Sequence, residues 1–168
     1  MLNTWPRGND GLFAFRDYRV MGENGDIVLT GTSYWTLIDF AQRRAVRLRD
    51  YINAYDVTDE LATNRSTLDR ISLPNMDNPD FVFELQARDS MIDHTNHVNN
   101  SEYIKLIFDA LAECGFNADK PFGLELNFQH ETKPGDTLRV ALLQTDGSYY
   151  AVVNNSIGIS VVAHIMPI

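Results

Sequence analysis

Residues 93–104 read Asp-His-Thr-Asn-His-Val-Asn-Asn-Ser-Glu-Tyr-Ile, a dense polar cluster that runs into an amphipathic pattern. Asn99 can cap a helix, and Glu102, three residues later, completes a capping-box arrangement. Apolar residues then recur at helical spacing: Ile104, Ile107, Phe108 and Leu111. We therefore expect a helix that runs to about Glu113 and stops at Gly115. Because the first backbone N–H groups of a helix are unpaired and lie at its positive end, the cluster is suited to hold a developing oxyanion.

Composition places the chain among ordinary globular proteins. It has 168 residues, of which 44% are hydrophobic, so we expect one domain or two small ones. A net charge of −9 and a pI near 4.7 argue against nucleic acid and anionic membrane as partners. The single cysteine, Cys114, excludes an internal disulfide and a cysteine-based metal site. Residues 1–6 lack the apolar run of a signal peptide, and we expect a cytoplasmic protein.

Strand patterns flank the predicted helix. Residues 12–21 and 27–40 are expected to form a hairpin around a turn at 22–26, and residues 5–11 are expected to be a loop. A further strand is expected at 81–87. Four more follow the helix, at about 122–131, 136–145, 149–153 and 156–165. One strand, one long helix and a meander indicate an α+β domain whose antiparallel sheet buries the helix.

This order of elements and these motifs resemble the hotdog fold of acyl-carrier-protein thioesterases. Asp93 and the run His97–Tyr103 resemble the signature at the start of that family's central helix, and residues 128–136 resemble its strand with a catalytic carboxylate. Four earlier segments resemble the second half of the family's first hotdog domain: residues 4–6, 15–18, 33–39 and 43–44. The resemblance implies an antiparallel sheet wrapped around one central helix. It also implies a cofactor-free thiol ester hydrolase that releases fatty acids from acyl carrier protein.

The resemblance also implies a division of the chain. We expect a partial N-terminal hotdog over residues 1–50 (a hairpin remnant without its helix), a linker over 51–79, and a complete C-terminal hotdog domain over 80–168. Family members have two complete domains, so this chain is expected to begin after the first strand and helix of the first one. Since the complete domain then has only half a partner, we expect a homodimer, which light scattering at micromolar concentration can test.

The polar cluster and Glu131 suggest hydrolysis by an activated water molecule. Glu131 is the candidate general base, because a carboxylate beside a helix N-terminus can be partly desolvated. His97 is expected to orient the water or the thioester carbonyl, and Asp93 to fix the tautomer of the imidazole. Thr95, where the family usually has asparagine, can hydrogen-bond the water. The backbone amides of three further residues are expected to hold the oxyanion: Val98, Asn99 and Asn100.

Several alternatives remain open at this point. His97 and the asparagines can simply cap the helix. Strict strand alternation places His130, rather than Glu131, on the face of Leu124, Leu126 and Phe128, unless a bulge intervenes near Gln129. A metal site is a competing interpretation, with these candidate ligands: Asp89, Asp93, His94, His97 and His130 or Glu131.

Four arginines between residues 43 and 49 stand out in an acidic chain: Arg43, Arg44, Arg47 and Arg49. They are either a solvated helix face or a docking patch for an acidic acyl carrier protein. The chain as a whole also has an alternative interpretation, as a catalytically silent fragment that binds acyl chains or oligomerises. Acyl-CoA instead of the carrier protein is a near variant of the hydrolase hypothesis.

Overall fold

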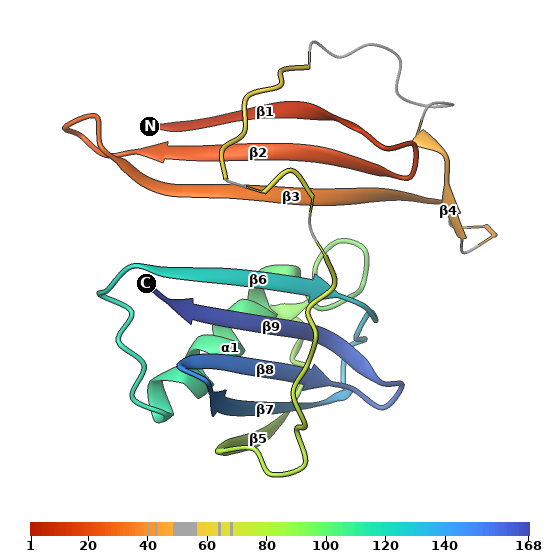
Figure 1. Ribbon diagram of the computed structural model, residues 1–168. Coiled ribbons are helices and arrows are strands. Elements are labelled where there is room, and N and C mark those ends of the chain that lie inside the picture. Colours follow the sequence, from red (N-terminus) through yellow and green to blue (C-terminus); the bar gives the residue numbers. More distant parts are fainter. Residues whose placement is uncertain (40, 43, 49–56, 64, 68) are drawn as a thin grey trace. The chain divides into compact units, whose positions relative to one another are not determined.

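The computed structural model describes residues 1–39, 41–42, 44–48, 57–63, 65–67 and 69–168 (Figure 1). Two compact units divide the chain, Met1–Asp69 and Arg70–Ile168. The N-terminal unit is a four-stranded antiparallel sheet in the order β1-β2-β3-β4. Its strands are β1 (Leu2–Asn9), β2 (Phe13–Met21), β3 (Ile27–Asp39) and β4 (Arg44–Val46). The predicted hairpin is thus the β2–β3 pair.

Two elements of this unit differ from the sequence-based expectation. Residues 5–9 lie in β1 and not in a loop. Pro6 is tolerated there because β1 is the edge strand, and the register with β2 shifts between Pro6 and Gly8. Residues 44–46, considered as part of a helix face, form the short strand β4 against the end of β3. Among the described residues of this unit, 1–69 with its gaps, there is no α-helix.

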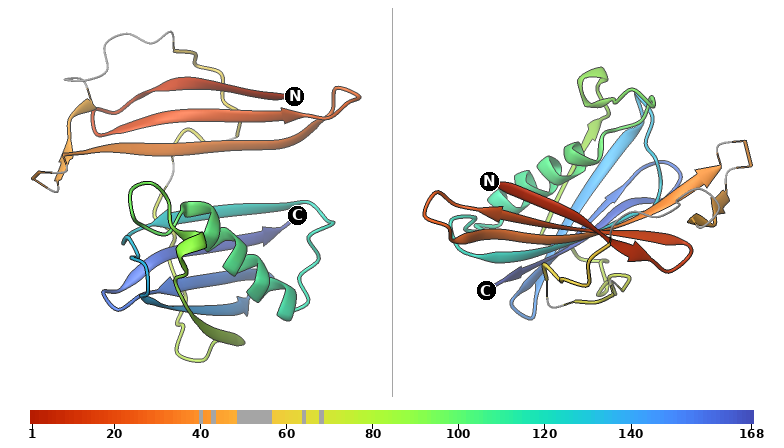
Figure 2. Two further views of the ribbon diagram at one scale, coloured as in Figure 1. Left: turned by 180° about the vertical axis from the view of Figure 1, so that it is seen from behind. Right: turned by 90° about the horizontal axis from the view of Figure 1, so that it is seen from above.

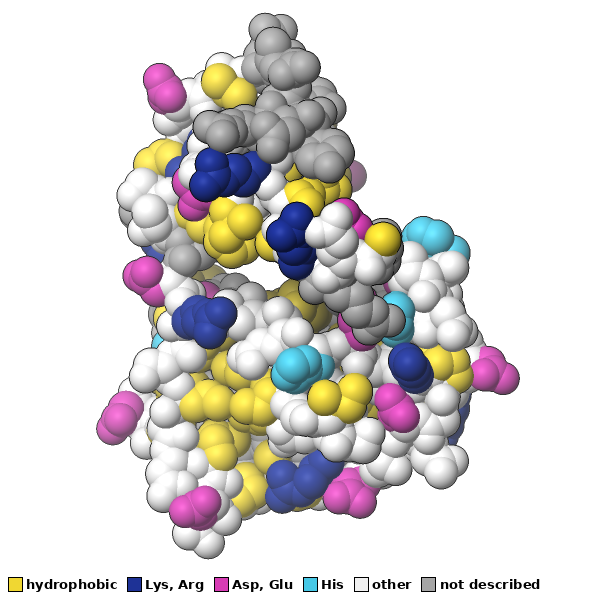
Figure 3. Space-filling model, turned by 90° about the vertical axis from the view of Figure 1, so that its right-hand side faces the viewer, with side chains coloured by type: hydrophobic (Ala, Val, Ile, Leu, Met, Phe, Trp, Pro, Cys, Tyr) yellow, Lys and Arg dark blue, Asp and Glu magenta, His cyan; other side chains and the backbone are white. Residues whose placement is uncertain are grey.

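Part of the predicted linker packs on the N-terminal sheet. The Trp5 indole N–H donates to the Glu60 carbonyl at 3.0 Å, and the Ala62 N–H donates to Asp17 Oδ2 at 2.8 Å. Asp17 is fully buried and pairs with Arg7, whose Nε lies 3.3 Å from Asp17 Oδ1. Hydrophobic side chains nevertheless stay exposed on this unit, several of them along β3, and Figure 3 shows such side chains between charged ones.

The C-terminal unit is a five-stranded antiparallel sheet in the order β5-β7-β8-β9-β6. Its strands are β5 (Phe81–Gln86), β6 (Phe122–Phe128), β7 (Thr137–Thr145), β8 (Ser148–Asn154) and β9 (Ile159–Pro167). Helix α1 (Asn100–Glu113) lies across one face of this sheet, as both views in Figure 2 show. A 3-10 turn, η2 (Asp89–Met91), precedes it. A sheet around one long central helix is the arrangement expected for the hotdog fold.

The core of this unit forms between the apolar side of α1 and the inner face of the sheet. Ile107 and Leu111 on the helix are fully buried with Leu138, Val140 and Val153 on the strands. Helical spacing places the two helix residues on one side, and strand alternation does the same for the sheet residues. This packing fixes the direction of α1, and therefore the place of its N-terminus. None of the helices in the described part of the chain is long and apolar enough to cross a bilayer.

The N-terminus of α1 is capped as predicted in one respect and differs in another. The Asn99 side chain accepts the Ser101 N–H at 2.9 Å, so Asn99 is the N-cap. The reciprocal half of the expected capping box is absent: the Asn99 N–H donates to the Met91 carbonyl, and the Glu102 carboxylate pairs with Lys105. The Met91 carbonyl, in the segment before the helix, therefore accepts the Asn99 N–H that Glu102 would have accepted in a capping box.

Candidate active site

A tight loop before α1 positions Asp93, Thr95 and His97. The Asp93 N–H donates to the His97 carbonyl at 2.9 Å, and Ile92 and Val98 form an isolated antiparallel bridge. Asn96 closes this loop with a φ of 64°, a left-handed conformation that asparagine tolerates better than most residues. The three side chains therefore emerge from one short reversal of the chain.

A second loop brings Glu131 to the same place. Strand β6 ends at Phe128, and the Gln129 N–H donates to the Ser160 carbonyl of β9 at 2.8 Å. The Val98 N–H then donates to the Thr132 carbonyl at 2.9 Å. Since His97 and Glu131 each directly precede a member of this bonded pair, the two side chains come together across it.

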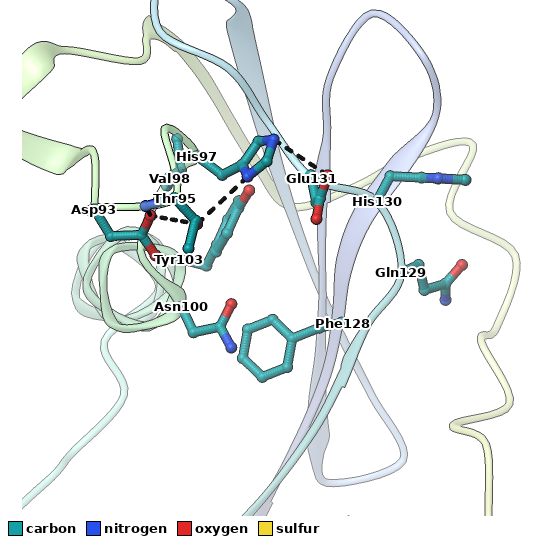
Figure 4. A pocket seen from close by; sticks show the side chains of 10 residues that line it. All are labelled: Asp93, Thr95, His97, Val98, Asn100, Tyr103, Phe128, Gln129, His130 and Glu131. Atoms are coloured by element: carbon teal, nitrogen blue, oxygen red, sulfur yellow. Dashed lines mark hydrogen bonds and ion pairs between the residues drawn. The ribbon is translucent and has the colours of Figure 1, made fainter. Parts of the chain in front are cut away.

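The four predicted catalytic side chains form one connected series (Figure 4). The Thr95 hydroxyl donates to Asp93 Oδ1 at 2.6 Å and lies 3.5 Å from His97 Nδ1. On the other side of the ring, His97 Nε2 lies 3.2 Å from Glu131 Oε2. Asp93 therefore reaches the imidazole through the Thr95 hydroxyl, where the sequence suggested direct contact.

The contacts of the Thr95 hydroxyl and of the two His97 ring nitrogens constrain which atoms donate hydrogen bonds in this series. The Thr95 hydroxyl has one proton, and its short bond to Asp93 uses it, so the hydroxyl presents a lone pair to His97 Nδ1. The contact with an ionised Glu131 needs a proton on Nε2. The His97 ring therefore lies between a hydroxyl oxygen at Nδ1 and a carboxylate at Nε2.

The series lines a pocket between the start of α1 and the end of β6. Ten residues surround this pocket: Asp93, Thr95, His97, Val98, Asn100, Tyr103, Phe128, Gln129, His130 and Glu131. Figure 4 shows the Glu131 carboxylate beside His97 and the His130 ring turned away from it. Because β6 ends at Phe128, strand alternation no longer governs residues 130 and 131. In the structure Glu131, and not His130, therefore faces His97.

Glu131 is more open to solvent than its expected role suggested. Its side chain is 59% exposed, whereas that of His97 is 22% exposed. The expected partial desolvation of the carboxylate is thus small in this structure. The reason is that the 129–132 loop leaves the sheet before Glu131 and projects its side chain from the rim of the pocket.

The three backbone amides expected to hold an oxyanion have different surroundings. The Val98 N–H is bonded to Thr132, and the Asn99 N–H is bonded to Met91. Within the described chain, the Asn100 N–H has no hydrogen-bond partner, and Asn100 lines the pocket. The first residue of the helix is therefore the amide donor left for a ligand, because the other two satisfy carbonyls of neighbouring segments.

The remaining predicted site residues lie elsewhere. Arg44 and Arg47 are exposed on the N-terminal unit, whereas Arg43 and Arg49 are outside the described residues. No group of three or more His, Cys, Asp or Glu side chains in the described ranges is arranged to hold a metal ion. Cys114 follows the last residue of α1, and burial raises the pKa of its thiol.

Sequence reasoning missed two apolar walls of the pocket. Tyr103 lies one turn into α1 with its ring 6.3 Å from that of Phe128, centre to centre. Burial raises the pKa of Tyr103 above its usual value. Helical spacing from Asn99 could have identified Tyr103, because residues four apart share a face of the helix. Strand alternation assigned Phe128 to the face of Leu124 and Leu126, but its place at the pocket depends on where β6 ends.

Comparisons with known proteins agree with this fold. Residues 75–159 match the family model of the acyl-ACP thioesterase C-terminal domain, and residues 1–55 match that of the N-terminal domain. The first match alone extends over half of the chain. No curated protein sequence matches the chain.

Two solved structures illustrate the likeness of fold. One is the 12:0-ACP thioesterase from Umbellularia californica, with a TM-score of 0.83 and 18% identity over 98% of this chain and 66% of that chain. The other is an acyl-ACP thioesterase from Bacteroides thetaiotaomicron, with a TM-score of 0.73 and 20% identity over 98% of this chain and 67% of that one. The expected hotdog fold is thereby confirmed. This chain spans about two thirds of the length of these proteins.

The Thr95 hydroxyl should control the ionisation of Asp93. Hydrogen bonds from the hydroxyl and then from the N–H of Thr95 lower the pKa of Asp93. We predict that Thr95→Val raises the Asp93 pKa toward its usual value, because a hydrogen bond that favours the charged form is lost. The pKa should stay below that value, since the N–H bond remains. Titration of the side-chain carboxyl by ¹³C NMR measures this, with Thr95→Ser as the control that keeps the hydroxyl. An unchanged Asp93 pKa in Thr95→Val contradicts the prediction.

Proposed function

Because the chain belongs to the acyl-ACP thioesterase family, we propose that it hydrolyses the thioester of an acyl-acyl carrier protein and releases the fatty acid. The observation that carries this proposal is the 3.2 Å contact between His97 Nε2 and Glu131 Oε2 at the N-terminus of α1. This contact holds a carboxylate that can accept a proton at a pocket that Asn100 also lines, and the Asn100 N–H can stabilise negative charge there.

In the proposed first step, water attacks the carbonyl carbon of the thioester. Glu131 accepts one proton from this water while the water oxygen forms the new C–O bond. The His97 Nε2–H holds the other side of the carboxylate and fixes its orientation. The electron pair of the C=O bond moves to the carbonyl oxygen, and the Asn100 N–H stabilises the resulting oxyanion.

In the second step the tetrahedral intermediate collapses. The C=O bond forms again and the C–S bond breaks, so the carrier leaves as a thiolate. Glu131 returns its proton to the sulfur and becomes a carboxylate again. Water and thioester are thus converted to fatty acid and thiol without a covalent enzyme intermediate. Thr95 and Asp93 act by holding the imidazole in place.

Removal of the base should reduce turnover strongly. We expect Glu131→Gln, which removes the base, and His97→Ala, which removes the group that orients it, to lower kcat for an acyl carrier thioester by about 10²–10⁴-fold, the usual contribution of a positioned general base. The measurement is steady-state hydrolysis with release of free thiol. His130→Ala is the matched comparison: its ring points away from His97, so its loss should lower kcat far less than Glu131→Gln does (Figure 4).

Three results would argue against this assignment. One is full activity in both Glu131→Gln and His97→Ala. The second is a loss in His130→Ala as large as that in Glu131→Gln. The third is a chain with no turnover of any acyl thioester, which would favour the silent acyl-binding or oligomerising fragment.

We further propose that Arg44 and Arg47 contribute to docking of the acidic carrier protein. Both side chains are exposed, and the chain as a whole is acidic, so a local basic patch can attract an acidic partner. A small thioester substrate makes no such contact. The two kinds of substrate therefore separate docking from chemistry.

Charge reversal tests the docking role. We expect Arg44→Glu combined with Arg47→Glu to raise KM for the carrier-linked substrate by roughly tenfold, because like charges then face each other. KM for a small acyl thioester should not change. Arg70→Glu combined with Lys120→Glu makes the same change in net charge at other exposed positions and is the control. Equal effects on both substrates would refute docking at these arginines.

A further inference from the structure

The backbone that carries Glu131 is held by a side chain of the turn between β8 and β9. Asn155 Nδ2 donates to the Glu131 carbonyl at 3.0 Å and to Thr132 Oγ1 at 3.1 Å. Both protons of the amide are thereby used on two successive residues of the 129–132 loop. The amide bonds backbone and hydroxyl and leaves the Glu131 carboxylate free for the pocket.

The Asn155 amide is itself fixed before it reaches this loop. The side-chain Oδ1 accepts the Ile157 N–H at 2.8 Å and the Gly158 N–H at 3.1 Å. The backbone N–H of Asn155 donates to the Gly158 carbonyl at 2.9 Å. These bonds close the turn around the side chain and hold it in one orientation. Such an amide is preorganised, so the bonds that it donates need little further ordering.

Thr132 connects this anchor to the interior. Its hydroxyl lies 3.0 Å from that of Ser160, and the two residues are 0% and 1% exposed. The Thr132 carbonyl accepts the Val98 N–H, one residue after His97. Thr132 is therefore bonded to Asn155, to β9 and to the segment that bears His97, so the two halves of the site share this support.

We propose that Asn155 is a positioning residue for the hydrolysis described under Proposed function: its amide anchors the Glu131 backbone and so keeps the carboxylate against His97. The inference rests on that function. Because the Glu131 side chain is 59% exposed, packing does little to fix it, and its place depends on the backbone behind it. A displacement of about 1 Å between reacting groups can cost on the order of 10²-fold in rate.

The variant Asn155→Asp isolates the donated bonds. Aspartate keeps an oxygen for the Ile157 and Gly158 N–H groups, so the turn can still form, but it has no amide to donate to the Glu131 carbonyl. Asn154→Asp is the matched control, since it adds the same charge one residue earlier, at the end of β8. Both variants are made in the otherwise unchanged chain and in Glu131→Gln.

We expect Asn155→Asp to lower kcat by about tenfold, because both donated hydrogen bonds are lost and the backbone of a group that must be in place for the reaction is held less firmly. KM should stay within about threefold of the parent value, because the anchor does not contact substrate. In the Glu131→Gln background the same substitution should produce no further loss, since no base remains to be positioned. Asn154→Asp should leave kcat unchanged in either background.

The outcomes distinguish this inference from the proposed function. If Glu131→Gln is inactive but Asn155→Asp stays within about threefold of the parent kcat, positioning by Asn155 is wrong and the base assignment stands. An equal loss in both backgrounds, or a loss confined to KM, also overturns the inference. If Glu131→Gln is fully active, the proposed function fails first. Should Asn155→Asp not fold, Asn155→Ser, which keeps an oxygen for the turn, takes its place under the same criteria.

Discussion

One backbone hydrogen bond makes this site possible, the 2.9 Å bond from the Val98 N–H to the Thr132 carbonyl. It joins two segments that are 34 positions apart, directly after His97 on one side and Glu131 on the other. A bond between main chains does not depend on which side chains they carry. The register that it sets decides that an imidazole and a carboxylate face each other. A shift of one residue would place His130 or Thr132 opposite His97.

The packing of α1 determines where this bond can form. Ile107 and Leu111 fix the helix against the sheet, so its first turn lies beside the end of β6. The Asn99 cap satisfies the Ser101 N–H, and the Met91 carbonyl takes the Asn99 N–H. What remains at the helix start is the Asn100 N–H beside a pocket. The packing of the hydrophobic core thus places the positive end of the helix dipole at the pocket, and the two loops place His97 and Glu131 beside it.

Local patterns predicted the parts of the structure whose causes are local. The α1 region follows from the Asn99 cap and helical periodicity, and most strands follow from composition and turns. Sequence alone could not decide whether Glu131 or His130 faces His97, because that choice depends on β6 ending at Phe128. It also could not show that the Val98 and Asn99 amides are occupied, since their partners belong to other segments. Pro6 misled for a similar reason: a proline is acceptable in β1 only because β1 is an edge.

A protein can prepare a carboxylate for catalysis by desolvation or by orientation, and the solvent exposure of Glu131 distinguishes the two. Burial can do so by removing solvent, but the Glu131 side chain is 59% exposed, so this route contributes little. Orientation is the other route, and here each support of Glu131 acts on orientation: His97 on the carboxylate, Asn155 on the carbonyl behind it, and Thr132 on the next peptide unit. In the proposed mechanism, an exposed Glu131 held by bonds to its backbone can meet a water molecule without being desolvated first. The proposed mechanism is therefore sensitive to geometry, because a displacement of about 1 Å between reacting groups can cost on the order of 10²-fold in rate.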